Sequence, residues 1–269
     1  MRAAKERRAD NEPQVGALPD FVIIGAQKCG TSSLYHLLIQ HPYVAPAVKK
    51  EVHFFDNRFE EGIEWYRQNF PTPEWKDGRR TVTGEATPYY LFHPHVAKRM
   101  AEAVPQAKLI VLLRNPIDRA YSHYNQAVRR EIEPLKFEVA IEAEEERLRG
   151  EREKMLEDER HASFSHQQFS YLSRGVYVDQ LARWAEFFDR EQLLVLKSED
   201  FLRNSRETLE LVLHFLGLPE WEPDASELQK KRNSRKYEKM DPETKRKLEE
   251  YFGPHNKRLY DYLGRDFGW

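Results

Sequence analysis

The sequence predicts an α/β fold in which helices flank a central, mostly parallel sheet. Four short runs of aliphatic or β-branched residues are typical of buried parallel strands: 21–25, 81–85, 108–114 and 193–199. Amphipathic stretches with helical periodicity separate them: 31–40, 93–104, 116–130, 176–189 and 204–217. Such alternation of strands and helices favours a layered α/β domain.

Each expected element has local support. The run FVIIG is followed by Gly30 and then by a helical pattern, so a strand leads directly into a helix. After the run KLIVLL, Asn115 is a good helix N-cap and Pro116 suits the first helical position. We therefore expect a helix to begin at the tip of the third strand.

The remaining segments are less regular. Residues 137–160 are rich in Glu and Arg with few apolar positions, which predicts a solvated helix or an excursion from the domain. Three prolines between 219 and 242 surround the basic run KKRNSRK, which predicts a loop. The C-terminal part predicts two helices divided at Gly253 and Pro254.

Domain organisation follows from length. The chain has 269 residues, no repeat of fixed period and no long Gly/Ser linker. We expect one domain over 19–269, preceded by a disordered or solvated tail over 1–18.

Charge and composition narrow the functional classes. The net charge is −2, from 43 Lys+Arg and 45 Asp+Glu, so no general positive field indicates a nucleic acid partner. The single cysteine, Cys29, cannot form an internal disulfide, which favours a reducing compartment. The aliphatic run 109–113 is far shorter than the roughly 20 residues of a membrane helix, and the charged N-terminus lacks the apolar stretch of a signal peptide. We predict a cytoplasmic protein without a membrane span; the oligomeric state is not indicated.

The segment AQKCGTSS after the first expected strand predicts an anion site. Gly25 and Gly30 permit a tight turn, Lys28 supplies a cation, and Thr31 and Ser32 place hydroxyls in the first turn of the following helix. Backbone N–H groups at a helix N-terminus bind phosphate well. The alternative is an ordinary strand-to-helix turn with an exposed lysine.

Two features argue against a nucleoside triphosphate with Mg²⁺. The lysine precedes the glycine by two residues, unlike the order G-K-[ST] of the triphosphatase loop. The strand 108–114 ends in Arg114, where a Mg²⁺-binding carboxylate is expected. We therefore predict an anionic nucleotide held without a metal, with Arg114 and Ser122 at a second phosphate. For Ser122 alone, a plain surface serine is the alternative.

These motifs resemble those of the PAPS-dependent sulfotransferases, where PAPS is 3′-phosphoadenosine 5′-phosphosulfate. The resemblance is to the branch that contains the heparan sulfate sulfotransferases and their bacterial relatives. It is carried by GAQKCGTSSL (25–34), KKEVHFFD (49–56), GEATPYYL (84–91), KLIVLLRNPIDRAYSHY (108–124), FLGLP (215–219), KRNSRKY (231–237) and the terminal DFGW. It implies a P-loop-like α/β fold, transfer of a sulfuryl group from PAPS and no metal.

The resemblance also implies roles for individual residues. Lys28, Gly30, Thr31 and Ser32 are expected to hold the 5′-phosphosulfate, and Arg114 and Ser122 the 3′-phosphate. Cys29 lies in the same cofactor loop, as a packing residue or, alternatively, a reactive thiol. The family's later Lys-Gly-Arg loop falls on Asn233, Ser234 and Arg235, so only the arginine is retained. Lys231 and Arg232 are expected to supply the missing charge.

The block KKEVHFFD carries the expected catalytic groups. In this branch its glutamate, here Glu51, is the general base, and His53 and Asp56 match positions that line the acceptor site. We expect Phe54 and Phe55 to desolvate Glu51 and raise its pKa. His53 is the alternative base, with an ordinary pKa of about 6.5. The structural alternative is a surface Lys–Glu pair beside a buried Phe–Phe pair.

One departure from the family bears on the acceptor. Ala86 stands in the stretch Glu-Ala-Thr-Pro where the heparan enzymes carry a lysine, which argues against a uronate-rich polysaccharide. We expect the acceptor to be a small alcohol, sugar, lipid or polyketide hydroxyl. One alternative is a P-loop small-molecule kinase, but the sequence offers no evident carboxylate to bind Mg²⁺. The other is a non-catalytic nucleotide-binding protein. The joint presence of Lys28, Glu51 and His53 argues against it.

Overall fold

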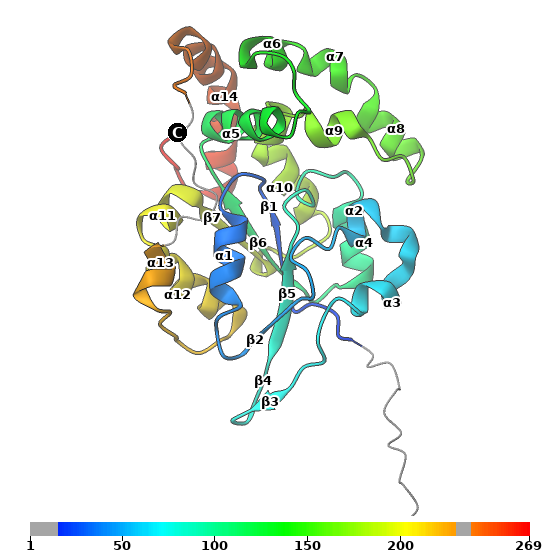
Figure 1. Cartoon of the computed structure of the whole chain (residues 1–269), viewed down its shortest axis with the longest axis vertical. Helices are drawn as coiled ribbons and strands as arrows, with labels where there is room; N and C mark the ends of the chain where they lie inside the picture. The colour runs from blue at the N-terminus through cyan, green and yellow to red at the C-terminus, as the bar shows by residue number, and fades with distance from the viewer. Residues whose placement is uncertain (1–15, 230–237) are drawn as a thin grey trace, which may run out of the picture.

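A computed structural model describes residues 16–229 and 238–269 of the chain. Five parallel strands form its central sheet in the order β2-β5-β1-β6-β7 (Figure 1). The strands are β1 (Phe21–Gly25), β2 (Val44–Pro46), β5 (Val82–Ala86), β6 (Lys108–Leu113) and β7 (Leu193–Lys197). The four strands expected from the sequence are confirmed. The edge strand β2 was not expected, because three residues ending in proline give too short a pattern to detect.

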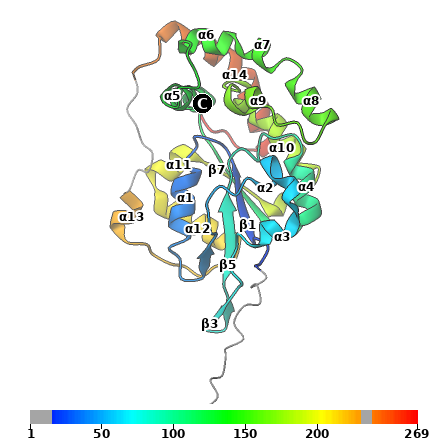
Figure 2. The same cartoon turned by 45° about the vertical axis from the view of Figure 1, so that its right-hand side comes forward.

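Helices cover both faces of the sheet. On one side lie α1 (Thr31–Leu38), α11 (Ser198–Arg203) and α12 (Ser205–Leu216), with the short α13 (Ala225–Gln229) beyond them (Figures 1 and 2). On the other side lie α2 (Phe54–Asn57), α3 (Gly62–Arg67), α4 (Val96–Ala103) and α10 (Tyr177–Ala185). The hairpin of β3 (Trp75–Lys76) and β4 (Arg79–Arg80) extends from the far end of the molecule.

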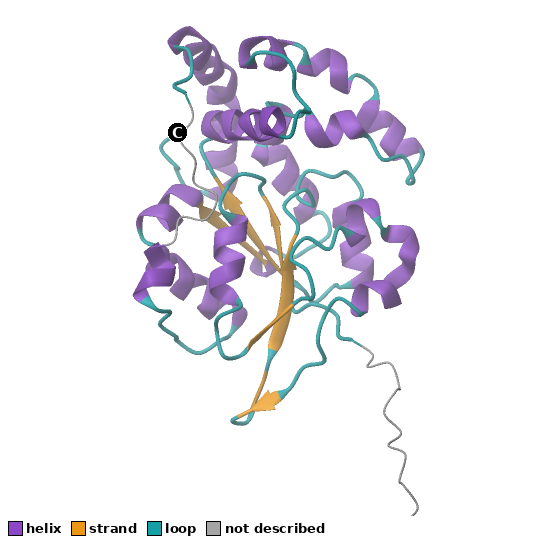
Figure 3. Cartoon of the chain, in the orientation of Figure 1, coloured by secondary structure: helices purple, strands orange, loops and turns teal. Residues whose placement is uncertain are grey.

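A third group of helices lies above the carboxyl ends of the strands (Figure 3). It comprises α5 (Pro116–Arg129), α6 (Phe137–Glu142), α7 (Glu144–Leu148), α8 (Glu151–Glu157), α9 (Phe164–Gln168) and α14 (Pro242–Leu263). Parallel α/β sheets commonly bind ligands at this edge. The third group therefore forms a roof over the place where a ligand is expected.

The core is built around the middle strands. Every residue of β1 is buried, as are the five apolar residues Leu109–Leu113 of β6. Trp184 of α10 is fully buried and donates its indole N–H to the carbonyl of Leu91 at 3.1 Å. Strands β1 and β6 pair directly, so their carboxyl ends bring the loop 26–30 and Arg114 to the same edge of the sheet.

The predicted division of the C-terminal part into two helices is wrong. Helix α14 is continuous over 22 residues with Pro254 inside it. Proline removes one backbone hydrogen bond and usually interrupts a helix. Here Gly253 and Pro254 are exposed, while Phe252 and Asn256 beside them are buried. Packing on both sides of the proline therefore keeps the two halves in one helix.

The acidic segment 137–160 forms three short helices, α6 to α8, as an excursion from the sheet. It is not wholly solvated, because Glu144 is buried and accepts hydrogen bonds from the N–H groups of Leu172 and Ser173 at 2.6 and 2.8 Å. At the other end of the chain, Gly16 is buried and Leu18 packs against the core. The tail expected over 1–18 otherwise lies outside the described residues. None of the helices in the described ranges is long and apolar enough to cross a membrane.

Candidate active site

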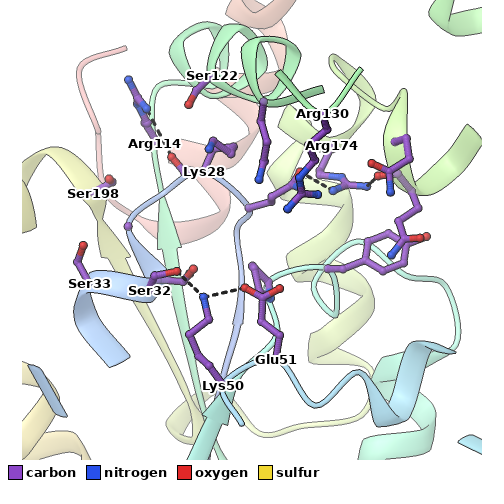
Figure 4. Close-up of a pocket in the computed structure, with 18 of the residues that line it drawn as sticks. Lys28, Ser32, Ser33, Lys50, Glu51, Arg114, Ser122, Arg130, Arg174 and Ser198 are labelled. Carbon is purple, nitrogen blue, oxygen red and sulfur yellow. Dashed lines mark hydrogen bonds and ion pairs between the residues drawn. The ribbon is translucent and has the colours of Figure 1, made fainter. Parts of the chain in front are cut away.

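A cavity of about 600 Å³ lies at the carboxyl edge of the sheet, below α5 (Figure 4). Segments that are distant in the sequence meet there: the loop after β1, the residues before α2, the tip of β6, and α5. The structure thereby brings together eight of the predicted site residues: Lys28, Gly30, Thr31, Ser32, Glu51, His53, Arg114 and Ser122.

The loop after β1 has an unusual backbone. Lys28 and Gly30 both adopt left-handed conformations, with φ of 72° and 93°. Gly30 takes this conformation without a Cβ penalty and directly precedes α1. In the first turn of α1 the Ser33 N–H donates to the Gly30 carbonyl at 2.9 Å, whereas the N–H groups of Thr31 and Ser32 precede the first intrahelical bond. The loop therefore presents both the Lys28 ammonium and backbone donors to the cavity.

Lys28 lies among other cations. Burial lowers its pKa to about 8, with further lowering by Arg129, Arg114 and Arg130. Its ammonium is thus poised to gain stabilisation from any anion that enters the cavity.

Arg114 and Ser122 lie on the α5 side of the cavity. The hydroxyl of Tyr177 donates to the Arg114 carbonyl at 2.8 Å, and an Arg114 guanidinium nitrogen donates to the Lys28 carbonyl at 3.4 Å. The Asn115 side chain accepts from the Ile117 and Asp118 N–H groups, which confirms the predicted cap. The cap holds Arg114 at the tip of β6.

Two further residues of α5, Gln126 and Arg129, and its C-cap residue Arg130 also line the cavity and were not predicted. They follow Ser122 by four, seven and eight positions, which places all four on one helical face. The side-chain oxygen of Gln126, Oε1, is buried without a hydrogen-bond partner among the described residues. Their helical spacing from Ser122 is the sequence signal that could have predicted these residues at the site.

Glu51 and His53 are adjacent in space. A Glu51 carboxylate oxygen lies 3.5 Å from His53 Nε2, and His53 Nδ1 lies 2.7 Å from Asp56 Oδ2. Asp56 was expected to line the acceptor site. Its side chain is instead fully buried and does not line the cavity. Through its contact with Nδ1 it orients the His53 ring.

The expected rise in the Glu51 pKa is wrong. Desolvation does raise that pKa, but hydrogen bonds from His53 and Lys50 outweigh it and lower the pKa to about 2. The side chain is 41% exposed, because Phe54 and Phe55 point into the core rather than over it. Desolvation likewise lowers the His53 pKa, but Asp56 and Glu51 outweigh it and raise the pKa to about 10. His53 is therefore a cation at neutral pH.

The desolvated carboxylate is Glu85, which the sequence argument did not select. It is fully buried at the end of β5 and accepts hydrogen bonds from Tyr66, Tyr90 and Thr87 and from the Val52 N–H at 3.1 Å. Burial raises its pKa to about 7. Glu85 does not line the cavity; it fixes the backbone between Glu51 and His53.

Lys50 was also missed, although it directly precedes Glu51. Its ammonium donates to the Ser32 hydroxyl at 2.6 Å and lies 2.7 Å from a Glu51 carboxylate oxygen (Figure 4). Lys50 thus links the loop after β1 to the predicted base. Only the tertiary fold reveals this contact, since Ser32 and Lys50 belong to different segments.

Arg174 forms the far wall of the cavity. It is buried, donates to the Gln27 side chain at 2.6 Å, and lies over the Tyr89 ring with 5.0 Å to its centroid. Burial lowers its pKa to about 9. With Lys28, Lys50 and the arginines of α5, it makes the cavity strongly cationic.

The remaining predicted residues lie elsewhere. Cys29 is buried, its thiol pKa is raised by burial to about 11, and its N–H donates to the Ala26 carbonyl at 3.2 Å. It is thus a packing residue of the loop and not a reactive thiol. Lys231, Arg232, Asn233, Ser234 and Arg235 lie outside the described residues.

The family model and the solved structures and relatives compared with this chain all point to the same family. Residues 18–258 match the family described as "Sulfotransferase domain". A solved sulfotransferase from Alicyclobacillus acidocaldarius is 33% identical, with a TM-score of 0.73 over 93% of this chain and 98% of that one.

Two curated relatives are longer than this chain. The membrane-associated sulfotransferase kil1 of Dictyostelium discoideum is 28% identical over 96% of this chain, which spans 68% of that protein. The human heparan sulfate glucosamine 3-O-sulfotransferase 3B1 is 30% identical over 94% of this chain, which spans 65% of it.

Proposed function

Because the chain belongs to the sulfotransferase family, we propose that its cavity binds PAPS and transfers the sulfuryl group to an acceptor hydroxyl. The observation that carries this proposal is the arrangement of the cavity. Two groups of cationic and hydroxyl side chains, at Lys28 to Ser32 and at Arg114 with Ser122, line one cavity whose wall also carries the Glu51 carboxylate. A nucleotide with phosphates at both ends of its ribose suits this arrangement.

In the proposed reaction, an acceptor oxygen attacks the sulfur of PAPS. The bond between sulfur and the 5′-phosphate oxygen breaks, and adenosine 3′,5′-bisphosphate (PAP) leaves with that electron pair. Glu51 takes the acceptor proton. Negative charge develops on the leaving oxygen, where the Lys28 ammonium and the N–H groups at the start of α1 stabilise it.

Separation of Lys50 from Glu51 would make Glu51 a stronger base. In the free protein Lys50 holds the carboxylate in its ionised form and keeps its pKa low. The sulfuryl group of PAPS brings negative charge next to Ser32, the other partner of Lys50. We propose that the ammonium then moves toward the sulfuryl oxygens, so that the Glu51 pKa rises when the acceptor is bound.

Lys50→Met should lower kcat by about tenfold to a hundredfold, the scale for a charged hydrogen bond of about 1.5–3 kcal/mol. Steady-state kinetics at saturating PAPS measure this change. The matched control is Lys49→Met, since Lys49 is exposed and absent from the cavity lining. If the two variants have the same kcat, Lys50 has no role in the reaction.

Binding of PAP should be at least about tenfold tighter than binding of AMP, since one added phosphate contact with a cation is worth about 1.5–3 kcal/mol. Isothermal titration calorimetry without added metal measures both affinities, with ATP as a third ligand. Arg114→Ala should remove most of the difference. Equal affinity for PAP and AMP contradicts the 3′-phosphate site, and a strict requirement for Mg²⁺ supports a kinase instead.

The proposal also includes the location of the enzyme in the cell. The single cysteine supports a reducing compartment, and we propose the cytoplasm. Fractionation of the native cells by ultracentrifugation tests this location, because the Dictyostelium relative is described as membrane-associated. Recovery of the protein in the membrane pellet contradicts it.

A further inference from the structure

A second, smaller hollow of about 200 Å³ adjoins the main cavity. Tyr89 and Gln167 line both spaces, so the hollow continues the end of the cavity that contains His53 and Arg174. We call it the side chamber. Its outer wall comes from α8 and α9 and the residues between them, a segment without any of the motifs that indicate the family.

The lining of the side chamber is uncharged. Tyr89, Met155, Ala162 and Phe164 contribute aromatic and aliphatic surface. The polar lining residues are Asn57, His93, Ser163 and Gln167. Burial holds the His93 pKa at about 2, so this imidazole is neutral at any working pH. Among the described residues that line the chamber, none carries a charge at pH 7.

This contrasts with the main cavity, where Lys28, Lys50, Arg114, Arg129, Arg130 and Arg174 gather. The proposed nucleotide brings anionic groups to that cationic region. A carboxylate or ammonium in the side chamber has no charged partner there, and burial of an unpaired charge is costly. An uncharged group meets no such cost.

The apolar surface also matches a ring in size and chemistry. An apolar cavity of about 150 Å³ accommodates benzene. Phe164 lines the chamber and is 58% exposed, so part of its ring is open to contact with a ligand. Its ring packs edge-on against Phe169 with centroids 5.6 Å apart, which holds it at the chamber.

We infer that the side chamber binds an uncharged aromatic ring or short hydrocarbon chain of the acceptor, while the acceptor hydroxyl lies at Glu51. This inference rests on the proposed function. It narrows the class of acceptors from hydroxyl compounds in general to neutral hydroxyl compounds with an apolar group. The excursion of the chain over α8 and α9 then determines acceptor choice.

Three phenols with a common ring test the inference: 4-ethylphenol, the anion 4-hydroxyphenylacetate and the cation tyramine. Ligand-observed NMR titration gives their dissociation constants, with and without saturating PAP. With PAP occupying the cationic cavity, we expect 4-ethylphenol to bind at least about tenfold more tightly than either charged probe, a difference of about 1.4 kcal/mol. Sulfation rates with PAPS should follow the same order.

Two variants locate the binding. Ala162→Trp fills the chamber from an exposed position and should weaken 4-ethylphenol binding at least tenfold. Phe164→Ser should weaken it as well. The matched control is Phe187→Ser. Phe187 is an exposed phenylalanine that precedes β7, and it lies at the end of that strand that is remote from the cavity. PAP affinity should be unchanged in all three.

Equal binding of a charged probe, no binding of 4-ethylphenol, or unchanged binding in Ala162→Trp overturns the inference. Loss of the proposed function gives a different result. In that case PAP fails to bind, whereas 4-ethylphenol still binds and Ala162→Trp still weakens that binding.

Discussion

Replacement of Glu51 by glutamine should lower kcat by about a hundredfold to ten-thousandfold, the range for loss of a general base. Glutamine preserves the shape of the side chain and its contact with Lys50 through the amide oxygen. It cannot accept the acceptor proton. PAP affinity, measured by calorimetry, should change little, because Glu51 is expected to face the acceptor.

His53→Asn is the companion variant, because His53 lies within 3.5 Å of Glu51. If His53→Asn abolishes turnover while Glu51→Gln remains active, His53 is the base and the assignment from the family is wrong. If both are inactive and still bind PAP, the two residues act as a unit.

The pH profile of kcat/KM, which reports pKa values of the free enzyme, separates the same two candidates. The Glu51 pKa of about 2 in the free protein keeps the carboxylate ionised throughout the usual range, so kcat/KM should be nearly flat between about pH 5 and 8. His53 can act as a base only when neutral. Because its pKa is about 10 in the free protein, kcat/KM would then rise about tenfold per pH unit over the same range.

Lys28→Ala should lower kcat by about a hundredfold to a thousandfold, the scale for loss of one preorganised group that stabilises developing charge. The effect on kcat should exceed the effect on the acceptor KM. Lys98→Ala, on the exposed side of α4, is the control for a lost surface lysine. Thermal unfolding should show an intact fold, since Lys28 lies on a loop. Near wild-type turnover would mean that the loop takes no part in the reaction.

The same lysine predicts a pH dependence of binding. Its pKa is about 8 in the free protein, and bound phosphate favours the charged form and raises that pKa. PAP affinity should therefore be constant below about pH 7 and should fall as the pH rises through 8. Calorimetry in buffers of different ionisation enthalpy should detect proton uptake near pH 8. Lys28→Ala should abolish both effects.

The sulfotransferase class predicted from the motifs is confirmed by the family match. The structure confirms the parallel α/β sheet, which could be predicted because strand and helix periodicity are local properties. The helix after KLIVLL also begins where Asn115 and Pro116 predicted it. In contrast, the continuous helix across Pro254 depends on packing of Phe252 and Asn256, which no local signal encodes.

The sequence by itself determined the residues of the loop after β1, the cation at the tip of β6 and the acid and histidine of the KKEVHFFD block. These are short motifs whose chemistry depends on neighbours in the chain. Only the tertiary structure decided their electrostatics. Glu51 proved to be partly exposed between two cations, whereas Glu85 proved to be the buried carboxylate. Burial and charge contacts depend on segments that meet only on folding, and the pKa of a carboxyl group is set by those contacts.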